Sequence, residues 1–404
     1  MRPARLLLLG LAVSPLTAQA QAAWHGYLDL RLAAPASEQD WGDGGLGKTR
    51  FGGGNLDAVA SAALGASFQL APELLVAAEL QVQPEQERAA DLLEAWVRWR
   101  PVSTTPWRWS LRAGVFFPPV SLENDGPGWT SAWTLTPSAI NSWVGEELRA
   151  TGAEFRLEHR ARAGTWSATI AGLGRNDPAG DLLASRGWAM GDLTTGAFGA
   201  LREPDVYAPV ARTTVPVMFH PFREIDHRVG WYGAVRWDGA GGHGLSLLRY
   251  DNRADPTAWQ WQGGRKVFAW HTRFWSLGGQ ARIGDVTLLA QAMRGATAFE
   301  PQPGLYLDTE LAAGYLLAGW DRGRWQPALR LDWFQLRQLP DTLAAPLSEH
   351  GNALTAALNW RPREGWRITA ELLRVASARD QRTLEGRDAR TTELQAQLSV
   401  RWYF

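Results

Sequence analysis

The feature that most constrains this chain is a strict alternation of apolar and polar residues that recurs along its length. The last stretch reads ELQAQLSVRWYF, and every second residue from Leu394 to Phe404 is apolar. The stretch WRWSLRAGVFF, from Trp107 to Phe117, alternates in the same way. A period of two is that of a β-strand with one apolar face. Helical spacing is not sustained over comparable lengths, so the sequence predicts an all-β chain.

Sixteen segments of this kind can be counted, and most run for about ten residues, the length of a tilted strand that crosses a bilayer. The register of the segments near Gly244, Ala269 and Leu305 is ambiguous, and the others are clear. The segments begin near Trp24, Asp57, Leu74, Leu92, Trp107, Leu148, Thr165, Arg228, Gly244, Ala269, Val286, Leu305, Trp325, Asn352, Trp366 and Thr392.

The connections between these segments alternate between short turns and long loops. An even number of strands with turns on one side and loops on the other is the plan of an outer-membrane barrel, with both chain ends on the periplasmic side. The sequence therefore predicts a transmembrane antiparallel up-and-down β-barrel of about sixteen strands. The predicted long loops are 34–56, 84–91, 118–147, 176–227, 251–268, 295–304, 337–351 and 376–391.

The first residues form a secretory signal peptide by their composition. Arg2 and Arg5 precede an apolar stretch at 6–13, and Ala18-Gln19-Ala20 offers a cleavage site of small residues. We expect the signal peptide to span residues 1–20, with an alternative end at 22, and the barrel to span 21–404. The apolar stretch is too short for a membrane-spanning helix. The protein is thus expected to be exported.

Composition excludes several classes of function. The formal net charge is zero, so no basic surplus indicates nucleic acid as a partner. Cysteine is absent, which excludes disulfides and thiolate chemistry. The histidines form no HExxH or similar metal-binding spacing. His220, Glu224, Asp226 and His227 could hold a metal in the longest loop, but a solvated polar loop is the favoured interpretation. We therefore predict no catalytic residue, no metal and no cofactor.

Tryptophan, at 23 residues, gathers at the short-turn ends of the predicted strands. Amphipathic rings prefer the headgroup level of a membrane and form girdles there. Aromatic residues of a water-soluble core would not repeatedly occupy one end of the strands. The predicted interface girdle consists of Trp99, Trp107, Trp320, Trp325, Trp360, Trp366, Trp402 and Phe404.

The polar face of the predicted strands is rich in arginine and becomes the barrel interior. An aqueous channel requires such an interior, and a guanidinium binds carboxylate or phosphate through its planar fork. Acidic residues alternate with these arginines, so a wall of internal salt bridges is an equal alternative to a series of anion-guiding sites. The predicted pore-lining arginines are Arg98, Arg108, Arg112, Arg156 and Arg330.

The third long loop carries acids and tryptophans but no basic residue. Folding this loop into the barrel would bury its rings and narrow the pore. Its acids Glu123, Asp125 and Glu147 would then face Arg112 and Arg156 across a constriction, which selects solutes by size and charge. The alternative is an external loop that packs on itself.

Together these features resemble the Gram-negative outer-membrane porins: a signal peptide, sixteen alternating strands, an inward third loop and a terminal Phe404. The stretch LRAGVFFPPVSLEN resembles the matching stretch of the phosphate-selective porins. Those porins are associated with a lysine-rich lumen, whereas this chain has only Lys48 and Lys266.

The resemblance implies a passive channel for small hydrophilic solutes that is embedded in outer-membrane lipids and is commonly a homotrimer. Phe404 resembles the signal that such barrels present to the barrel assembly machinery. A channel specific for phosphate or other small anions is the first alternative. A barrel enzyme or an adhesin that uses loop 176–227 is the second.

Overall fold

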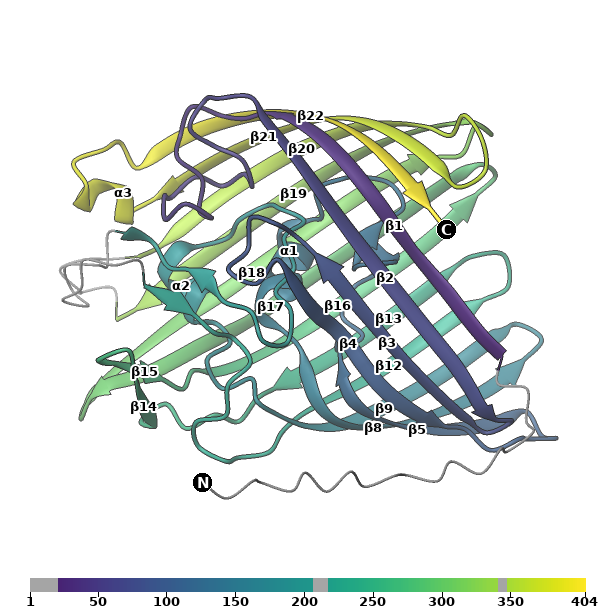
Figure 1. Ribbon diagram of the computed structural model, residues 1–404. Coiled ribbons are helices and arrows are strands. Elements are labelled where there is room, and N and C mark those ends of the chain that lie inside the picture. The colour runs from purple at the N-terminus through teal and green to yellow at the C-terminus, as the bar shows by residue number, and fades with distance from the viewer. Residues whose placement is uncertain (1–20, 206–216, 341–346) are drawn as a thin grey trace, which may run out of the picture.

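Sixteen antiparallel strands close into one barrel in the computed structural model, which describes residues 21–205, 217–340 and 347–404 (Figure 1). The predicted signal peptide lies outside the described residues. Each strand pairs with its neighbours in the chain, and the last pairs with the first. The barrel strands are β1 (Gln21–Ala34), β2 (Asp57–Ala71), β3 (Leu74–Val82), β4 (Ala90–Trp99), β5 (Trp107–Phe116), β8 (Ala150–Ala161), β9 (Gly164–Gly174), β12 (Gly230–Gly239), β13 (Gly244–Asp251), β16 (His271–Ile283), β17 (Val286–Gln302), β18 (Leu305–Trp320), β19 (Trp325–Leu339), β20 (Glu349–Trp360), β21 (Trp366–Arg379) and β22 (Arg390–Tyr403).

The prediction of a sixteen-stranded up-and-down barrel is confirmed, and the strands begin close to the predicted positions. One loop prediction is wrong. Residues 295–304 do not form a long loop, because β17 and β18 stay paired from Phe299 opposite Leu307 to Gln302 opposite Leu305. The alternation continues through this hairpin, where Thr297 points inward and bonds to Thr272 of β16 at 2.6 Å.

The barrel closes between β22 and β1, whose register places Tyr403 opposite Tyr27 and Leu398 opposite Leu32. Figure 1 shows the yellow end of the chain beside the purple first strand. Phe404 extends the ladder: its N–H donates to the Gly26 carbonyl at 3.2 Å, and its carbonyl accepts from the Gly26 N–H at 3.1 Å. Closure removes the unpaired edge that a terminal strand would otherwise expose.

The outer face of the barrel is apolar. Side chains that point outward are largely exposed, for example Leu30 at 65% and Leu277 at 58%. So large an apolar exterior is unfavourable in water and suits a lipid environment. Within the described residues, no helix is long and apolar enough to cross a membrane.

The loops carry short elements of their own. We call the barrel end from which the long loops leave the strands the long-loop end, and the opposite end the short-turn end. The loop elements are β6 (Asn124–Gly126), β7 (Thr130–Ser131), β10 (Leu201–Arg202), β11 (Met218–Phe219), β14 (Trp259–Gln262), β15 (Arg265–Phe268), α1 (Ala139–Glu147), α2 (Asp181–Arg186) and α3 (Gln381–Leu384).

Helix α1 of the third loop lies inside the barrel (Figure 1). Ser138 begins the helix by accepting the Asn141 N–H at 3.3 Å, as an N-cap residue does. The Ala139 N–H donates to Asp332 on β19, and the Trp143 ring lies 5.5 Å from Phe274 on β16. Since α1 contacts inward-facing side chains on separate parts of the wall, the third loop folds inward.

A hydrophobic core fills much of the long-loop half of the barrel. Trp143 and Trp188 pack edge to face, and inward-facing side chains of the strands join them. Leu311, Phe334 and Leu373 are examples of these wall residues, and all are buried. Much of the interior toward the long-loop end is therefore a packed layer.

Candidate functional site

A cavity of about 420 Å³ lies between the third loop and the inner face of β4, β5, β8 and β9. We call this space the vestibule. Arginine dominates its charged lining, with four guanidiniums and two carboxylates. The charged lining residues are Arg98, Arg100, Arg112, Arg156, Glu154 and Glu158.

Strand register sets the charge pattern on the vestibule wall. Arg98 on β4 lies directly opposite Arg112 on β5. Two like charges at directly opposite positions destabilise a sheet unless an opposite charge compensates them. Arg112 pairs with Glu154 at 3.0 Å, and Arg156 pairs with Glu158 at 2.9 Å.

Among the described residues, no carboxylate lies within 4 Å of the Arg98 or Arg100 guanidinium. Arg112 and Arg156 are thus neutralised by salt bridges, whereas Arg98 and Arg100 give the wall an excess of positive charge.

Aromatic faces hold the arginines in place. The Trp96 ring lies 5.7 Å from the Arg98 guanidinium carbon and 5.8 Å from that of Arg112. Arg112 also lies 4.0 Å from the Phe116 ring centroid. Cation–π contacts of this kind orient a guanidinium without neutralising it. These contacts therefore orient Arg98 and Arg112 and leave their forks open to an anion.

A stack of three side chains closes the vestibule toward the long-loop end. The Arg149 guanidinium lies 3.5 Å from the Phe117 ring centroid and 5.2 Å from that of Phe222. Phe117 in turn stacks on Trp129 at 3.7 Å. Arg149 is buried and donates to the Thr195 carbonyl at 2.5 Å. We call Phe117, Arg149 and Phe222 the partition.

A second basic cavity, of about 560 Å³, lies on the other side of the partition at the long-loop end. Phe222 lines this outer cavity, just as Phe117 lines the vestibule. Burial and the neighbouring Arg223 guanidinium lower the pKa of His220, so the positive charge there comes from arginine. The charged and titratable lining residues are Arg88, Arg175, His220, Arg223 and Glu224.

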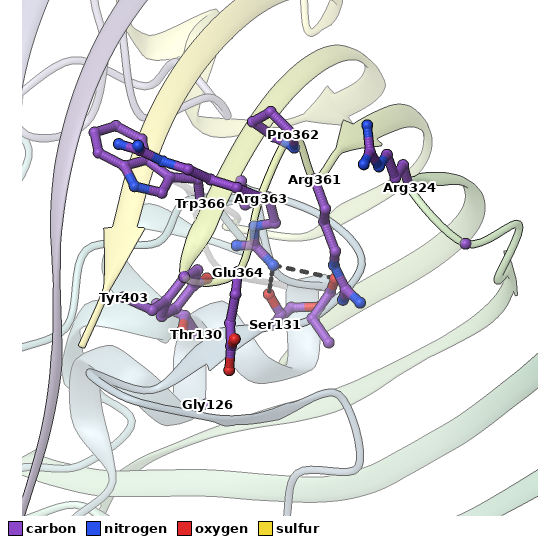
Figure 2. Close-up of a pocket in the computed structure, with 14 residues that line it drawn as sticks. Gly126, Thr130, Ser131, Arg324, Arg361, Pro362, Arg363, Glu364, Trp366 and Tyr403 are labelled. Atoms are coloured by element: carbon purple, nitrogen blue, oxygen red, sulfur yellow. Dashed lines mark hydrogen bonds between the residues drawn. The ribbon is translucent and has the colours of Figure 1, made fainter.

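A third cavity, of about 640 Å³, lies at the short-turn end beside the third loop (Figure 2). Arg367 on β21 donates to the carbonyls of Ser131 and Ala132 at 3.0 and 3.1 Å and so holds the loop against the wall. The charged residues of this mouth are again mainly basic: Arg324, Arg361, Arg363, Arg367 and Glu364.

The structure does not place Arg330 or Glu123 at a water-filled surface. Both side chains are fully buried, and Arg330 pairs with Glu123 at 3.4 Å and with Asp332 at 2.8 Å. Arg330 also donates to the Thr136 carbonyl at 2.6 Å. The prediction that these two residues line the pore is wrong, because the third loop lies directly on β19 and encloses them.

The predicted pairing of loop acids with Arg112 and Arg156 is also wrong. Glu147 is buried and accepts the N–H groups of Gly180 and Leu183 at 2.6 and 2.7 Å, which holds the start of α2. Asp125 is exposed at the loop surface. The two arginines take their carboxylate partners from the barrel wall instead: Arg112 from Glu154 across the β5–β8 ladder, and Arg156 from Glu158 along β8.

Arg98, Arg112 and Arg156 are thus brought together in the vestibule. Arg108 is half-buried and lies opposite Glu158 across the β5–β8 ladder. Sequence reasoning missed Arg149 and its two phenylalanines. The only signal was that Arg149 follows directly on a loop without basic residues, and nothing in the sequence links it to Phe222.

The predicted girdle residues all lie at the short-turn end, most of them exposed on the outer face. Trp325 and Trp360 stack at 5.8 Å across β19 and β20. Trp366 stacks on Trp402 at 6.4 Å and is half-buried, since it also lines the mouth in Figure 2. The full set is Trp99, Trp107, Trp320, Trp325, Trp360, Trp366, Trp402 and Phe404.

Three carboxylates of the longest loop meet in one place: oxygens of Asp177, Glu224 and Asp226 lie within 4.8 Å of one another. Burial, and next the charge of Asp226, raises the pKa of Asp177 to about 7. Each of the three accepts backbone N–H groups, such as that of Arg228 to Asp226 at 2.8 Å. These bonds give the cluster a role in shaping the loop.

The comparisons with known proteins identify the fold. The outer membrane channel DcaP of Acinetobacter baumannii is 10% identical, with 96% of this chain and 98% of that chain covered and a TM-score of 0.58. OprB of Pseudomonas putida is 10% identical, with 95% and 94% covered and a TM-score of 0.54. Salmonella typhi OmpF, solved with daunomycin, is 12% identical, with 95% and 98% covered and a TM-score of 0.53.

No protein-family model matches the sequence, and no curated protein matches it. At such low sequence identities, the similarity to these structures shows the fold of the chain and does not show which solute it transports. Strand number, strand order and coverage nevertheless agree with the resemblance seen in the sequence. The chain has the sixteen-stranded barrel fold of the Gram-negative outer-membrane porins.

Proposed function

We propose that this protein is an outer-membrane channel that lets small hydrophilic solutes, anions before cations, diffuse across the membrane without a cofactor and without catalysis. One observation carries the proposal: a closed barrel with an apolar exterior encloses a vestibule that holds four arginines and two carboxylates. An apolar exterior with a polar interior is the arrangement of a membrane channel.

In this proposal the short-turn end faces the periplasm, and the long-loop end faces outward. The aromatic girdle supports this orientation, because tryptophans such as Trp99 and Trp325 lie exposed at the level where the strands end. Export through the predicted signal peptide would place both chain ends at the periplasmic side. Lipids would then cover the outer face, and Phe404 would meet the assembly machinery.

The proposed route runs from the outer cavity past the partition into the vestibule. Phe222 lines the first space and Phe117 the second, and Arg149 lies against both rings. A passing solute requires these side chains to move aside. Guanidiniums stand before, within and after the partition, which favours anions along the whole route.

A channel specific for phosphate or another small anion is the second candidate. The narrow partition favours it over general diffusion, because buried rings would stop large hydrated solutes. The unpaired Arg98 and Arg100 offer planar forks that suit phosphate or carboxylate. Arginine would serve in place of lysine, since Lys48 is buried against Glu349 and Lys266 lies over Trp259.

A homotrimer is part of the proposal. OmpT of Vibrio cholerae, described in a trimer form, has a TM-score of 0.54 to this chain at 9% identity, with 95% of this chain and 99% of that chain covered. The outward face of β2 carries small residues, including Ala58 and Ala60, which allow close approach between barrels.

The vestibule charge can be tested with the double variant Arg98→Gln and Arg100→Gln. This variant removes two guanidiniums that have no carboxylate partner among the described residues, so it leaves none of the described acids unpaired. A unit charge about 4 Å from a passing ion in water contributes about 1 kcal/mol, so the anion-to-cation permeability ratio should fall about fivefold or more. Reversal potentials in planar bilayers under a salt gradient measure this ratio.

The matched control is Arg374→Gln with Arg390→Gln, which removes two exposed arginines from the outward positions of β21 and β22. The control should leave the ratio unchanged. An equal shift in both variants, or no shift in the vestibule variant, would show that Arg98 and Arg100 do not lie on the conducting route.

A further inference from the structure

A groove of about 500 Å³ lies on the outer face of the barrel, across β16 to β19. Its walls are two tryptophans, Trp275 on β16 and Trp333 on β19, with exposed fractions of 52% and 48%. Between them the floor consists of small residues, chiefly Ala292 and Ala312. The groove is separate from the vestibule, because the barrel wall stands between the two.

Strand register divides the groove into an apolar part and a polar part. The row toward the short-turn end contains Leu277, Ala292, Gly314 and Trp333, paired across the four strands. The next row contains Trp275, Arg294, Ala312 and Gln335, and the row nearest the long-loop end contains Arg273, Ala296, Glu310 and Arg337. Polarity therefore rises steadily toward the long-loop end.

Glycine shapes the apolar part into a slot. A Cβ atom at Gly314 would meet the Trp333 ring nitrogen at 2.6 Å, so the indole lies flat across this position only because Gly314 has no side chain. Trp275 is held from its other side by Arg249, whose guanidinium lies 5.5 Å from the ring. The slot is thus built from two oriented rings over a small-residue floor.

Charges on the outer face of a barrel are costly within the apolar part of a membrane, and they are tolerated where they reach the headgroups. Arg294 is exposed and lies at the upper end of the slot, and Arg337 and Glu310 flank it in the next row. Among the described residues, no carboxylate lies within 4 Å of the Arg294 guanidinium. The Arg294 charge therefore complements an anionic headgroup held above an apolar chain.

We propose that this groove binds one phosphate-bearing membrane lipid, with its phosphate at Arg294 and an acyl chain in the slot between Trp275 and Trp333. The inference rests on the proposed membrane location of the barrel. The phosphate would lie at the headgroup level of the leaflet on the long-loop side, and the chain would run toward the membrane centre. This orientation follows from the order of the three rows.

The test uses the chain refolded in lipid-free detergent and native mass spectrometry with three probes. Phosphatidylglycerol carries both phosphate and chains, diacylglycerol carries chains alone, and glycerol 3-phosphate carries phosphate alone. We expect one phosphatidylglycerol per chain, with either other probe about tenfold weaker or more, because each lacks one of the two contacts.

Two groove variants separate the contacts. Ala292→Leu with Ala312→Leu fills the slot and keeps the charges, and Arg294→Gln removes the phosphate partner and keeps the slot. Each should weaken phosphatidylglycerol binding about tenfold or more. Ala356→Leu with Ala370→Leu, and separately Arg374→Gln, make the same chemical changes at outward positions outside the groove. Both controls should bind as the wild type does.

Equal binding by groove and control variants would overturn the proposal, as would equal binding of phosphatidylglycerol and diacylglycerol. Groove variants that reduce oligomer mass but leave lipid binding unchanged would overturn it in favour of a contact between copies of this chain. Conductance is recorded on the same preparations. If the protein conducts ions but does not bind the lipid, only the lipid-binding proposal is overturned. If it binds the lipid but never conducts, only the channel proposal is overturned.

Discussion

At the scale of single residues, Arg149 is the side chain whose surroundings most need a functional explanation. It is buried, it lies against two phenylalanine rings, and its Nε has no hydrogen-bond partner among the described residues. The carboxylates of Glu94, Asp91 and Glu79 act on the Arg149 charge, but among the described residues none lies within ion-pair distance of it. Burying a guanidinium without a direct ion pair is unfavourable, and an anion passing through the channel would supply one.

Two substitutions in the partition should have different effects. Arg149→Gln should lower the anion-to-cation permeability ratio at least as much as the vestibule double variant, since charges act more strongly in a drier place. Phe222→Ala should raise single-channel conductance by opening the partition, with the charge kept. Single-channel recordings give both quantities, and heat-modifiable mobility in SDS gels shows whether each variant folds as a barrel.

A purely structural role for the partition would give another pattern. Folded variants with wild-type conductance and wild-type selectivity would show that ions take another path. The same conclusion would follow if Phe222→Ala lowered the conductance while Arg149→Gln left selectivity unchanged.

At the scale of elements, the third loop decides where water can enter. The Glu371 carboxylate on β21 accepts the Leu135 and Thr136 N–H groups, the first at 2.6 Å. Together with the bonds from Arg330 and Arg367, this contact holds the loop against β19 to β21. The opposite side of the lumen, along β4 to β9, is left as the vestibule. The position of the cavity is thus a consequence of how the loop is anchored.

The last strand carries an element-scale prediction. Gly26 has no side chain, so the Phe404 ring lies against β1 while its backbone extends the ladder. Phe404→Ser keeps both backbone hydrogen bonds and removes the ring. It should lower the yield of folded barrel in the outer membrane severalfold, measured by heat-modifiable mobility, while the inserted molecules conduct normally.

Phe404→Tyr is the control, because it retains the aromatic ring. A normal yield of the serine variant would show that the ring acts only as one more girdle aromatic. Wild-type yield combined with altered conductance would contradict the assignment of this residue to assembly.

At the scale of the whole molecule, the sequence alone could predict the barrel but not the loop contacts and cavities inside it. A strand shows its period within a few residues, so positions such as Leu394 and Gln395 could be assigned to opposite faces locally. The inward direction of Arg98, Arg112 and Arg156 followed from the same period, and the structure places them together.

Contacts of the loops depend on partners that are distant in the chain. Glu123 meets Arg330 across 207 positions, and Leu135 meets Glu371 across 236. No local pattern encodes such a pair, which is why the acids of the third loop were assigned to the wrong arginines. The two cavities and the partition between them arise from these distant contacts, so only the folded chain shows them.

Anion conduction through the arginine-lined interior of the barrel can be measured in a single recording. The chain comprising residues 21–404, refolded and inserted into a planar bilayer, is placed under a potassium chloride gradient, and the reversal potential is measured. We predict discrete conductance steps with a reversal potential displaced toward the chloride equilibrium value. Absence of steps from folded protein, or a displacement toward the potassium value, would contradict this prediction.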